Sequence, residues 1–183
     1  PPSPPQPPAE VAAPIAAPAA AARFTFTPQT GQFHQPTRHF GADAHDEANA
    51  VQLVHGEPFT PPGNSTFQAH YACVASIGQV RWALRELLQD KKVARAAHNI
   101  FAYRFVDSER GGVQISDNDD DGEAAAGGRL AALLELMGAR NVLVVVTRWF
   151  GGTLLGPARF KYITNAAREL IVQCNGLQQQ GLQ

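Results

Sequence analysis

The stretch NVLVVVTRWFGGTLLGPARF, Asn141–Phe160, contains the strongest strand signal of the chain, followed by a glycine-rich turn and a helix start. The apolar, mostly β-branched run from Val142 to Thr147 predicts a strand buried in the centre of a sheet. The next helix is expected to begin at Pro157, because proline's missing N–H is not needed in the first helical turn. This strand–turn–helix sequence sets the order of elements around which the rest of the chain is interpreted.

The segments before this stretch carry further strand and helix patterns. Ser76 and Gln79 form a capping box at the start of a helix that should end near Asp90. Strands are expected at 51–54, 65–74, 99–106 and 112–116, and a second helix at 129–137. The ERGG turn joins 99–106 to 112–116 as an antiparallel hairpin. We therefore expect an α/β (α+β) two-layer sandwich, with helices on one face of a mixed sheet of four or five strands.

Composition indicates one soluble domain of a cytoplasmic protein. The 183 residues are 44% hydrophobic and carry a net charge of −1, so no overall charge attracts the chain to nucleic acid or to an anionic membrane. Residues 1–50 are expected to form a Pro/Ala-rich, largely disordered arm without a membrane span. Residues 51–176 form the domain, and 177–183 form a flexible Gln-rich tail. The two cysteines, Cys73 and Cys174, suit buried, reduced thiols.

Polar residues converge on one end of the predicted sheet, which we call the rim. The strand–helix–strand order from Gly112 to Trp149 implies two parallel strands, so the loops that follow them lie at the same end. The hairpin brings the start of the 99–106 strand to this end as well. The candidate rim site consists of His98, Asn99, Asp119, Asp120, Asp121, Glu123, Arg148, Gly151 and Gly152. These residues either bind a ligand or form ion pairs and helix-start contacts that fix the loops.

The acidic loop DNDDDGE, Asp117–Glu123, partly matches the start of a calcium-binding loop. The twelfth position, where a bidentate glutamate belongs, is Gly128, and the preceding segment has the pattern of a strand rather than a helix. We therefore predict no calcium-binding helix–loop–helix and assign no metal ligand. Incidental binding of a divalent cation by this loop stays open as an alternative.

The glycines of the 150–157 loop do not form a nucleotide site. Gly151 and Gly156 have the spacing of a phosphate-binding loop, but Pro157 and Ala158 stand where lysine and serine or threonine would hold phosphate and Mg²⁺. No other catalytic motif is present, and His98 could act as a general base only by its position. We assign no catalytic residue and no cofactor, and we expect a protein that is not an enzyme.

Exposed residues on two predicted helices form a candidate partner surface. Trp82 lies opposite the apolar face of the first helix, so it is expected to point toward solvent, as an interface anchor would or beneath a covering segment of the chain. On the last helix, an exposed stripe of polar residues is expected. The candidate surface consists of Trp82, Lys161, Asn165 and Arg168.

Four segments together resemble the Impact family, which includes the eukaryotic Impact proteins and the yeast homolog of Impact. These segments are STFQAH (65–70), ARAAHNIFAYR (94–104), DDDGEAAAGGRL (119–130) and NVLVVVTRWFGGTLLGPARFKYITNAAREL (141–170). The resemblance covers about residues 57–176 and implies a fold like the second domain of a small-subunit ribosomal protein, with a left-handed crossover. It also implies a cytosolic regulator of translation.

The resemblance further implies protein partners. Family members compete for the activator of the starvation-responsive kinase of initiation factor two and keep that kinase inactive; binding to monomeric actin is also attributed to them. An N-terminal RWD domain makes the activator contact in those regulators, and residues 1–50 contain no such domain, so the chain is a fragment or has lost the contact. The alternative function, a ribosome- or RNA-binding module, draws on the ribosomal type of fold and on the Lys161–Asn165–Arg168 stripe.

Overall fold

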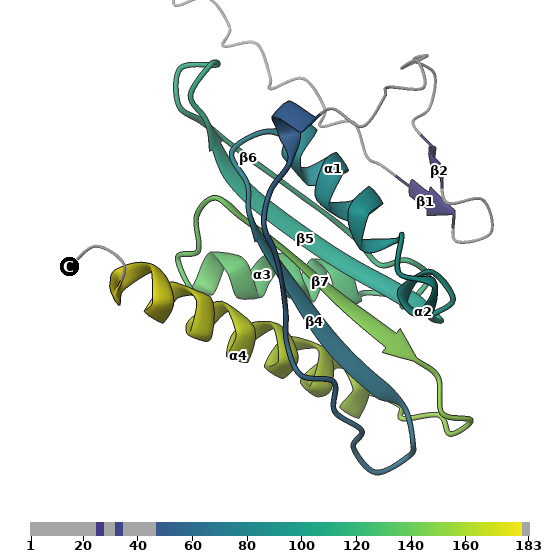
Figure 1. The fold of residues 1–183 in the computed structure, drawn as a ribbon. Coiled ribbons are helices and arrows are strands. Elements are labelled where there is room, and N and C mark those ends of the chain that lie inside the picture. The colour runs from purple at the N-terminus through teal and green to yellow at the C-terminus, as the bar shows by residue number, and fades with distance from the viewer. Residues whose placement is uncertain (1–24, 28–31, 35–46, 181–183) are drawn as a thin grey trace, which may run out of the picture.

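The computed structural model describes residues 25–27, 32–34 and 47–180, with β1 and β2 forming a separate small hairpin (Figure 1). The strands are β1 Thr25–Thr27, β2 Gln32–His34, β3 Leu53–His55, β4 Thr66–Cys73, β5 His98–Asp107, β6 Val113–Asp119 and β7 Val142–Trp149. The helices are α1 Ile77–Leu87, α2 Lys91–Ala94, α3 Ala126–Leu136 and α4 Ala158–Gln180, and Glu47–Asn49 forms a 3₁₀ turn. All predicted strands and helices of residues 51–176 are present.

The main sheet has five strands in the order β3-β4-β7-β5-β6, and every adjacent pair is antiparallel. The prediction of an α+β fold with a central 142–149 strand is confirmed, because β7 is the middle strand. The prediction of a mixed sheet is wrong. Strands β6 and β7 do run in the same direction, but β5 lies between them and is antiparallel to both. The loops that follow β6 and β7 therefore still lie at one end of the sheet.

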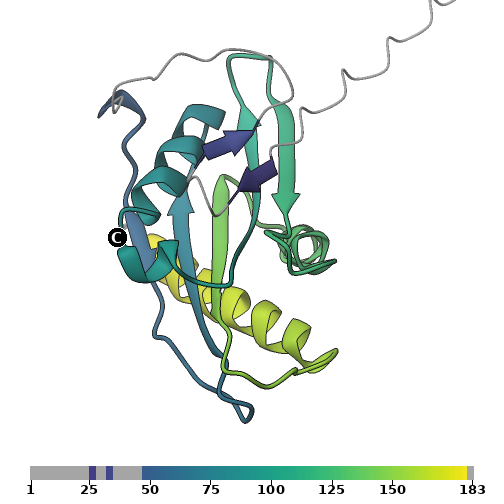
Figure 2. The ribbon, with the colours of Figure 1, turned by 90° about the vertical axis from the view of Figure 1, so that its right-hand side faces the viewer.

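Helices cover both faces of the sheet, so the prediction of two layers with helices on one face is also wrong (Figures 1 and 2). Helices α3 and α4 pack on the face that contains Val142, Val144 and Val146. Helix α1 packs on the opposite face, which contains Leu143 and Val145. A strand covered on both sides can be apolar at every position, and this explains the unbroken apolar run of β7.

The second helical layer follows from the handedness of two crossovers. The path from β4 to β5 through α1 and α2 passes β7, and the path from β6 to β7 through α3 passes β5. Two right-handed paths of this kind would place α1 and α3 on the same face of the sheet. Because they lie on opposite faces, one crossover is right-handed and the other is left-handed. The left-handed crossover implied by the family resemblance is therefore present, and it is what makes three layers.

Local capping explains where the first helix begins and ends. The Gln79 amide donates to Ser76 Oγ over 3.2 Å, and Gln79 Oε1 accepts from the Ala75 amide over 2.6 Å. The helix ends at Leu87 rather than near Asp90, because Asp90 is itself the N-cap of α2 and accepts from the Lys92 amide. The predicted start at Ser76 and Gln79 is confirmed, with the return hydrogen bond coming from Ala75 rather than Ser76, and the short helix α2 that follows was not predicted.

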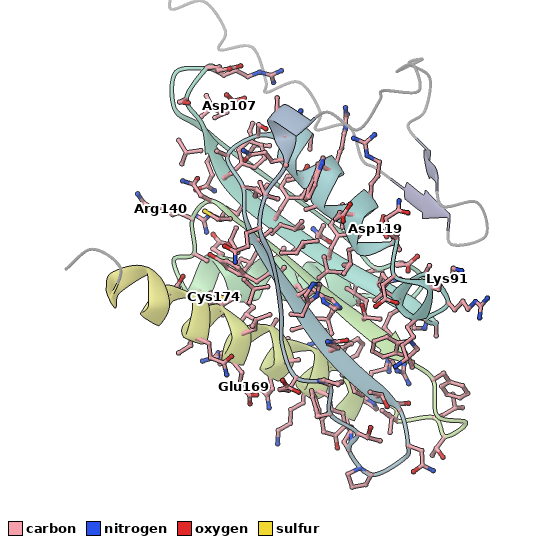
Figure 3. All side chains as sticks on the ribbon, viewed as in Figure 1. Lys91, Asp107, Asp119, Arg140, Glu169 and Cys174 are labelled. Carbon is pink, nitrogen blue, oxygen red and sulfur yellow. The ribbon has the colours of Figure 1, made fainter. Side chains whose placement is uncertain are left out.

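Trp82 and Cys73 are not where the pattern placed them. Trp82 is half-buried and packs against the core cluster under α1, together with the partly buried Ile115 of the edge strand β6. The apolar face of the sheet is thus wider than the helical stripe alone indicates, and Trp82 does not point freely into solvent. Cys73 is exposed at the end of β4, whereas Cys174 is buried between α4 and the sheet (Figure 3).

The predicted disordered arm lies mostly outside the described residues, so its boundary stays a prediction. Of the predicted flexible tail at 177–183, residues 177–180 lie in helix α4 and residues 181–183 lie outside the described residues. Within the described ranges, no helix is both long enough and apolar enough to cross a lipid bilayer.

Candidate functional site

The structure brings the predicted rim residues together at one end of the sheet. His98 and Asn99 begin β5, and Asp119 ends β6. Asp120, Asp121 and Glu123 follow in the turn before α3, Arg148 lies near the end of β7, and Gly151 and Gly152 follow it. The convergence expected from strand directions therefore holds, although the two strands are not adjacent.

Glu123 is the centre of the rim. Its carboxylate is buried and accepts a short hydrogen bond from Arg148 Nη1, while Arg159 Nε donates to its other oxygen over 2.6 Å. His98 Nε2 lies 3.5 Å from the same oxygen that Arg148 contacts. One carboxylate thus links β5, β7 and α4 to the turn before α3. Arg159 was not among the predicted rim residues, because an arginine in the first turn of a helix has no distinguishing sequence pattern.

Arg148 is buried among aromatic rings and polar groups of neighbouring loops. It is 5% exposed, and its guanidinium lies 5.7 Å from the centre of the Phe67 ring and 5.8 Å from that of Phe150. Ser65 Oγ, which is also buried, accepts from the Gly151 amide over 3.3 Å and lies 3.5 Å from Arg148 Nη2. Arg148 therefore fixes the glycine loop to the rim through both charge and ring contacts.

The acidic loop supplies acceptors to backbone amides. Asp120 accepts from the amides of Ala125 and Gly127 over 3.0 and 2.6 Å, and Asp119 accepts from the Asp121 amide over 2.7 Å. The N-cap residue of α3, Ala125, has a left-handed backbone and no capping side chain, so Asp120 takes over the capping role. Asp120 therefore serves to start the helix, and Asp119 fixes the turn before it.

Asp121 is buried and only partly satisfied. Its Oδ2 accepts from the Asn99 amide over 2.6 Å, while Oδ1 has no hydrogen-bond partner in the described part of the chain. Burial, together with the charge of Asp119, raises the pKa of Asp121 to about 6, although the Asn99 hydrogen bond and His98 oppose the rise. The His98 Nδ1–H donates to the Asp121 carbonyl over 2.8 Å, so β5 and the loop are joined at two points.

The two glycines of the rim have different roles. Gly152 has a φ of +87°, which only glycine adopts without strain, as the loop prediction required of one of them. A side chain at Gly151 would instead collide with the backbone, since a Cβ would lie 2.0 Å from the Asn64 carbonyl carbon and oxygen. Gly151 is thus needed for close approach of two loops, and Gly152 for the direction of the turn.

A second polar network crosses the opposite face of the sheet and was not predicted. His55 on β3 and His70 on β4 approach Nδ1 to Nδ1 at 2.8 Å, and His70 Nε2 lies 3.0 Å from Thr147 Oγ1 on β7. Thr147 then donates to Asn99 Oδ1 on β5 over 2.8 Å, and Asn99 Nδ2 donates to the Val93 carbonyl. A single histidine and a single threonine in apolar strands form no sequence pattern from which this hydrogen-bond network could be predicted.

The donor and the acceptor of each hydrogen bond in this second network can be assigned by starting from the Val93 carbonyl. That carbonyl only accepts, so Asn99 turns its amide toward Val93 and its oxygen toward Thr147. The hydroxyl proton of Thr147 is thereby used, so its oxygen accepts from His70 Nε2–H. Burial and, to a smaller extent, the nearby His55 lower the pKa of His70 to about 3, against the opposing charge of Asp90. His70 is therefore neutral, its Nδ1 accepts, and His55 Nδ1 donates.

The predicted partner surface is divided between the two helical layers. Lys161, Asn165 and Arg168 are exposed along α4, as predicted. Trp82 lies on α1, on the other side of the sheet, and is half-buried. The four residues therefore do not form one surface, because the side on which α1 packs could not be read from its own amphipathic pattern.

Metal-ligating side chains do not cluster in the described ranges: no group of three or more His, Cys, Asp or Glu residues is arranged to hold an ion there. The carboxylates of the acidic loop are instead directed at amides and arginines.

Comparison with known proteins gives a consistent result. A family model described as the Impact N-terminal domain matches residues 63–171. The IMPACT proteins of Rattus norvegicus and Homo sapiens are each 50% identical over 123 residues, covering 67% of this chain and 38% of the relative. The Danio rerio protein is 49% identical over 130 residues, which cover 71% of this chain and 40% of the relative. The chain spans about two fifths of the length of these curated relatives.

Two solved structures are also similar. The two-domain translational regulator Yih1 is 40% identical, with 75% of this chain and 49% of that chain covered at a TM-score of 0.47. A crystal structure described only as that of a hypothetical protein is 23% identical, with 67% and 61% covered and a TM-score of 0.52, so it shares the fold. Because the family model covers more than half of the residues and the IMPACT proteins are about 50% identical, the chain belongs to the Impact family.

Proposed function

We propose that this chain regulates translation initiation through protein–protein contacts and keeps the starvation-responsive kinase of initiation factor two inactive. The observation that carries the proposal is the match of the Impact N-terminal domain over residues 63–171, because translational regulation is what membership of this family implies. The protein partners are the activator of that kinase and monomeric actin, and the site of action is the cytoplasm.

The rim supports a role other than catalysis. Glu123 is occupied by Arg148 and Arg159, and Asp120 by two amides of the α3 start. An acid–base catalyst needs a titratable group directed at a substrate position, whereas these groups are directed at each other. We expect the purified protein to hydrolyse neither ATP nor GTP, and turnover that disappears with Arg148→Ala would contradict this.

The regulatory proposal is tested in amino-acid-starved cells that express the chain at a known level. We expect the ratio of phosphorylated to total initiation factor two to fall relative to cells that lack the chain. A matched control is Glu123→Gln, which removes the central carboxylate of the rim and should weaken the effect in proportion to the loss of folded protein. An unchanged ratio with soluble wild-type chain present would contradict the proposal.

Contact with the activator needs a separate measurement, because the chain spans about two fifths of the length of its relatives. Purified activator fragments and monomeric actin are each presented to the immobilised chain. Retention of the activator would show that this domain binds it without an RWD domain. Retention of actin alone would assign the regulatory effect to actin.

A second function, binding to RNA or the ribosome, is favoured by one observation. Lys161, Asn165 and Arg168 are exposed on one stripe of α4. If they contact phosphates, affinity for a single-stranded RNA oligonucleotide should fall steeply with salt, and Lys161→Ala or Arg168→Ala should each reduce the slope by about one. No detectable affinity at low salt would remove this function.

A further inference from the structure

The loop at residues 150–157 exposes large apolar side chains. Phe150 is 50% exposed and Leu154 is 88% exposed. Within the described residues, the large hydrophobic side chains that are exposed are Val113, Leu136, Phe150, Leu154 and Val172. Two of the five therefore lie in one short loop. Apolar side chains gathered in this way mark interaction sites more often than isolated ones do.

The same loop is held firmly at its base. Leu155 packs against the core and against Gly63, where a Cβ would meet its side chain, and Gly151 lies directly against the Asn64 backbone. Arg148 fixes the start of the loop, and Arg159 Nη1 donates to the Gly156 carbonyl over 2.7 Å at its end. A loop ordered before binding loses little conformational entropy when a partner covers it, so its apolar side chains can contribute most of their burial to affinity.

Charge at this end of the molecule is separated by depth. The carboxylates of Asp121 and Glu123 are buried, and Glu123 is occupied by two arginines. In contrast, Arg129 and Lys161 are exposed in the first turns of α3 and α4, neither of which has an acidic residue there. A cation near a helix N-terminus is disfavoured by the helix dipole unless an anion lies nearby. Arg129 and Lys161 are therefore exposed cations at this end of the molecule, where Asp117, Asp119 and Asp120 are half-buried.

Arg129 has a fixed position despite its exposure. Its guanidinium lies 4.2 Å from the centre of the Phe160 ring, and that of Arg159 lies 4.1 Å from the same ring. Arg159 forms an ion pair with Glu123, whereas Arg129 contacts the Phe160 ring. Stacking on an aromatic face orients a guanidinium and leaves its N–H groups free to donate to a carboxylate.

We propose that Phe150, Leu154, Arg129 and Lys161 form a docking surface for an acidic peptide segment of a protein partner, one that carries a leucine or aromatic side chain beside its carboxylates. The loop supplies the apolar contact, and the two cations at the helix starts supply the charge complementarity. This inference rests on the proposed function, in that it assigns the protein–protein contact to a particular surface and a particular partner chemistry.

The test uses a random peptide library displayed on phage, selected on the purified chain, and a synthetic labelled peptide of the resulting consensus. We expect Asp and Glu to be enriched beside Leu, Phe or Trp. Leu154→Ser and Arg129→Glu should each weaken binding of this peptide by about tenfold or more, as loss of an interface anchor does. Both residues are exposed, so the thermal unfolding midpoint of these variants should stay near that of the wild type.

Matched controls lie at the other end of α3. The side chain of Leu136 is 84% exposed, a fraction similar to that of Leu154. Arg140 is exposed in the loop after α3 (Figure 3). Leu136→Ser and Arg140→Glu should change the affinity by less than about twofold, as surface substitutions outside an interface do.

Several results would overturn the proposal: no acidic–apolar consensus, equal weakening by all four variants, or tighter binding of a single-stranded RNA oligonucleotide than of the peptide. In starved cells, Leu154→Ser should also lose the effect on initiation factor two phosphorylation. A Leu154→Ser chain that lowers phosphorylation as well as wild type would refute this surface and leave the proposed function standing. A wild-type chain without any effect would contradict the proposed function instead.

Discussion

Two buried polar networks on opposite faces of the sheet stabilise this domain with different chemistry, and Asn99 takes part in both. At the rim, Glu123 forms ion pairs with Arg148 and Arg159 and lies beside His98, and these contacts join loops and helix starts. On the other face of the sheet, His70, Thr147 and Asn99 form a chain of neutral groups between strands. A charged network is costly when one member is removed, because the remaining charge stays buried. A neutral chain loses only hydrogen bonds, but each of them has a fixed direction.

The largest expected effect is on the charged network. Glu123→Gln leaves Arg148 buried without a carboxylate, so we expect a loss of about 3–5 kcal/mol in the free energy of unfolding. Urea denaturation of wild type and variant measures the difference. Glu135→Gln on the exposed side of α3 is the control and should differ from wild type by less than about 0.5 kcal/mol. Equal stability of the two variants would show that the rim ion pairs are not structural.

The next effect distinguishes the two glycines of the rim. Gly151→Ala places a methyl group against the Asn64 backbone, which cannot move aside as a side chain could, so we expect a loss of about 3 kcal/mol. Gly152→Ala meets no atom of the described residues within 4 Å and should lose only the strain of its positive φ, about 1 kcal/mol. Thermal unfolding of both variants checks the order. The reverse order would mean that turn conformation, not loop contact, limits this site.

Substitutions in the neutral network should lower the free energy of unfolding less than those in the charged network. Thr147→Val keeps the shape of the side chain and leaves His70 Nε2–H and Asn99 Oδ1 without partners, at a cost of about 1–3 kcal/mol. Nitrogen-15 NMR of the wild type should show His70 as the Nε2–H tautomer. Finding the Nδ1–H tautomer at neutral pH would contradict the donors and acceptors assigned to this network, whatever the stability of the Thr147→Val variant.

The smallest expected effect is on how the free energy of unfolding changes with pH. The two networks should contribute slopes of opposite sign. The pKa of Asp121 is raised to about 6 from an ordinary value of 3.8, so the folded state holds this proton more tightly. Its contribution to stability therefore falls as pH rises through that interval. The pKa of His70 is lowered to about 3 from 6.5, so the unfolded state binds this proton more tightly, and stability rises with pH from about 3 to 6.5.

Asp121→Asn separates the two contributions. Asparagine tolerates the φ of +42° at this position and can still accept from the Asn99 amide. Removing the carboxyl should make stability rise more steeply between about pH 4 and 6, by at most about 1.4 kcal/mol per pH unit. Urea denaturation at several pH values measures this slope. An unchanged slope would mean that Asp121 titrates alike in the folded and unfolded chain.

The rim could be predicted because its residues lie at the ends of strongly patterned strands. The order of β6, α3 and β7 places Asp121, Glu123 and Arg148 at one end whichever strand lies between them. The neutral chain could not be predicted, because His70 and Thr147 become neighbours only through the register of β4 on β7. Sequence patterns give strand directions more readily than they give register.

The helical layers show a second limit of sequence patterns. The periodicity of α1 identifies a buried face but does not say which face of the sheet that helix covers. The side is set by the handedness of the crossover, and one of the two crossovers here departs from the usual hand. For this reason the number of layers was predicted wrongly, whereas the strands and helices of residues 51–176 were predicted apart from the short helix α2.

The central claim is that the charged rim network holds the 150–157 loop in the position from which Phe150 and Leu154 are presented. Amide hydrogen exchange in wild type and Glu123→Gln tests it most directly, read at the loop and at the paired strands β4 and β7 under conditions in which both proteins are folded. We expect exchange in the loop to accelerate by about tenfold or more, beyond the change at Tyr71 and Val144 in those strands. Equal acceleration of loop and strands, or an unaffected loop, would contradict the claim.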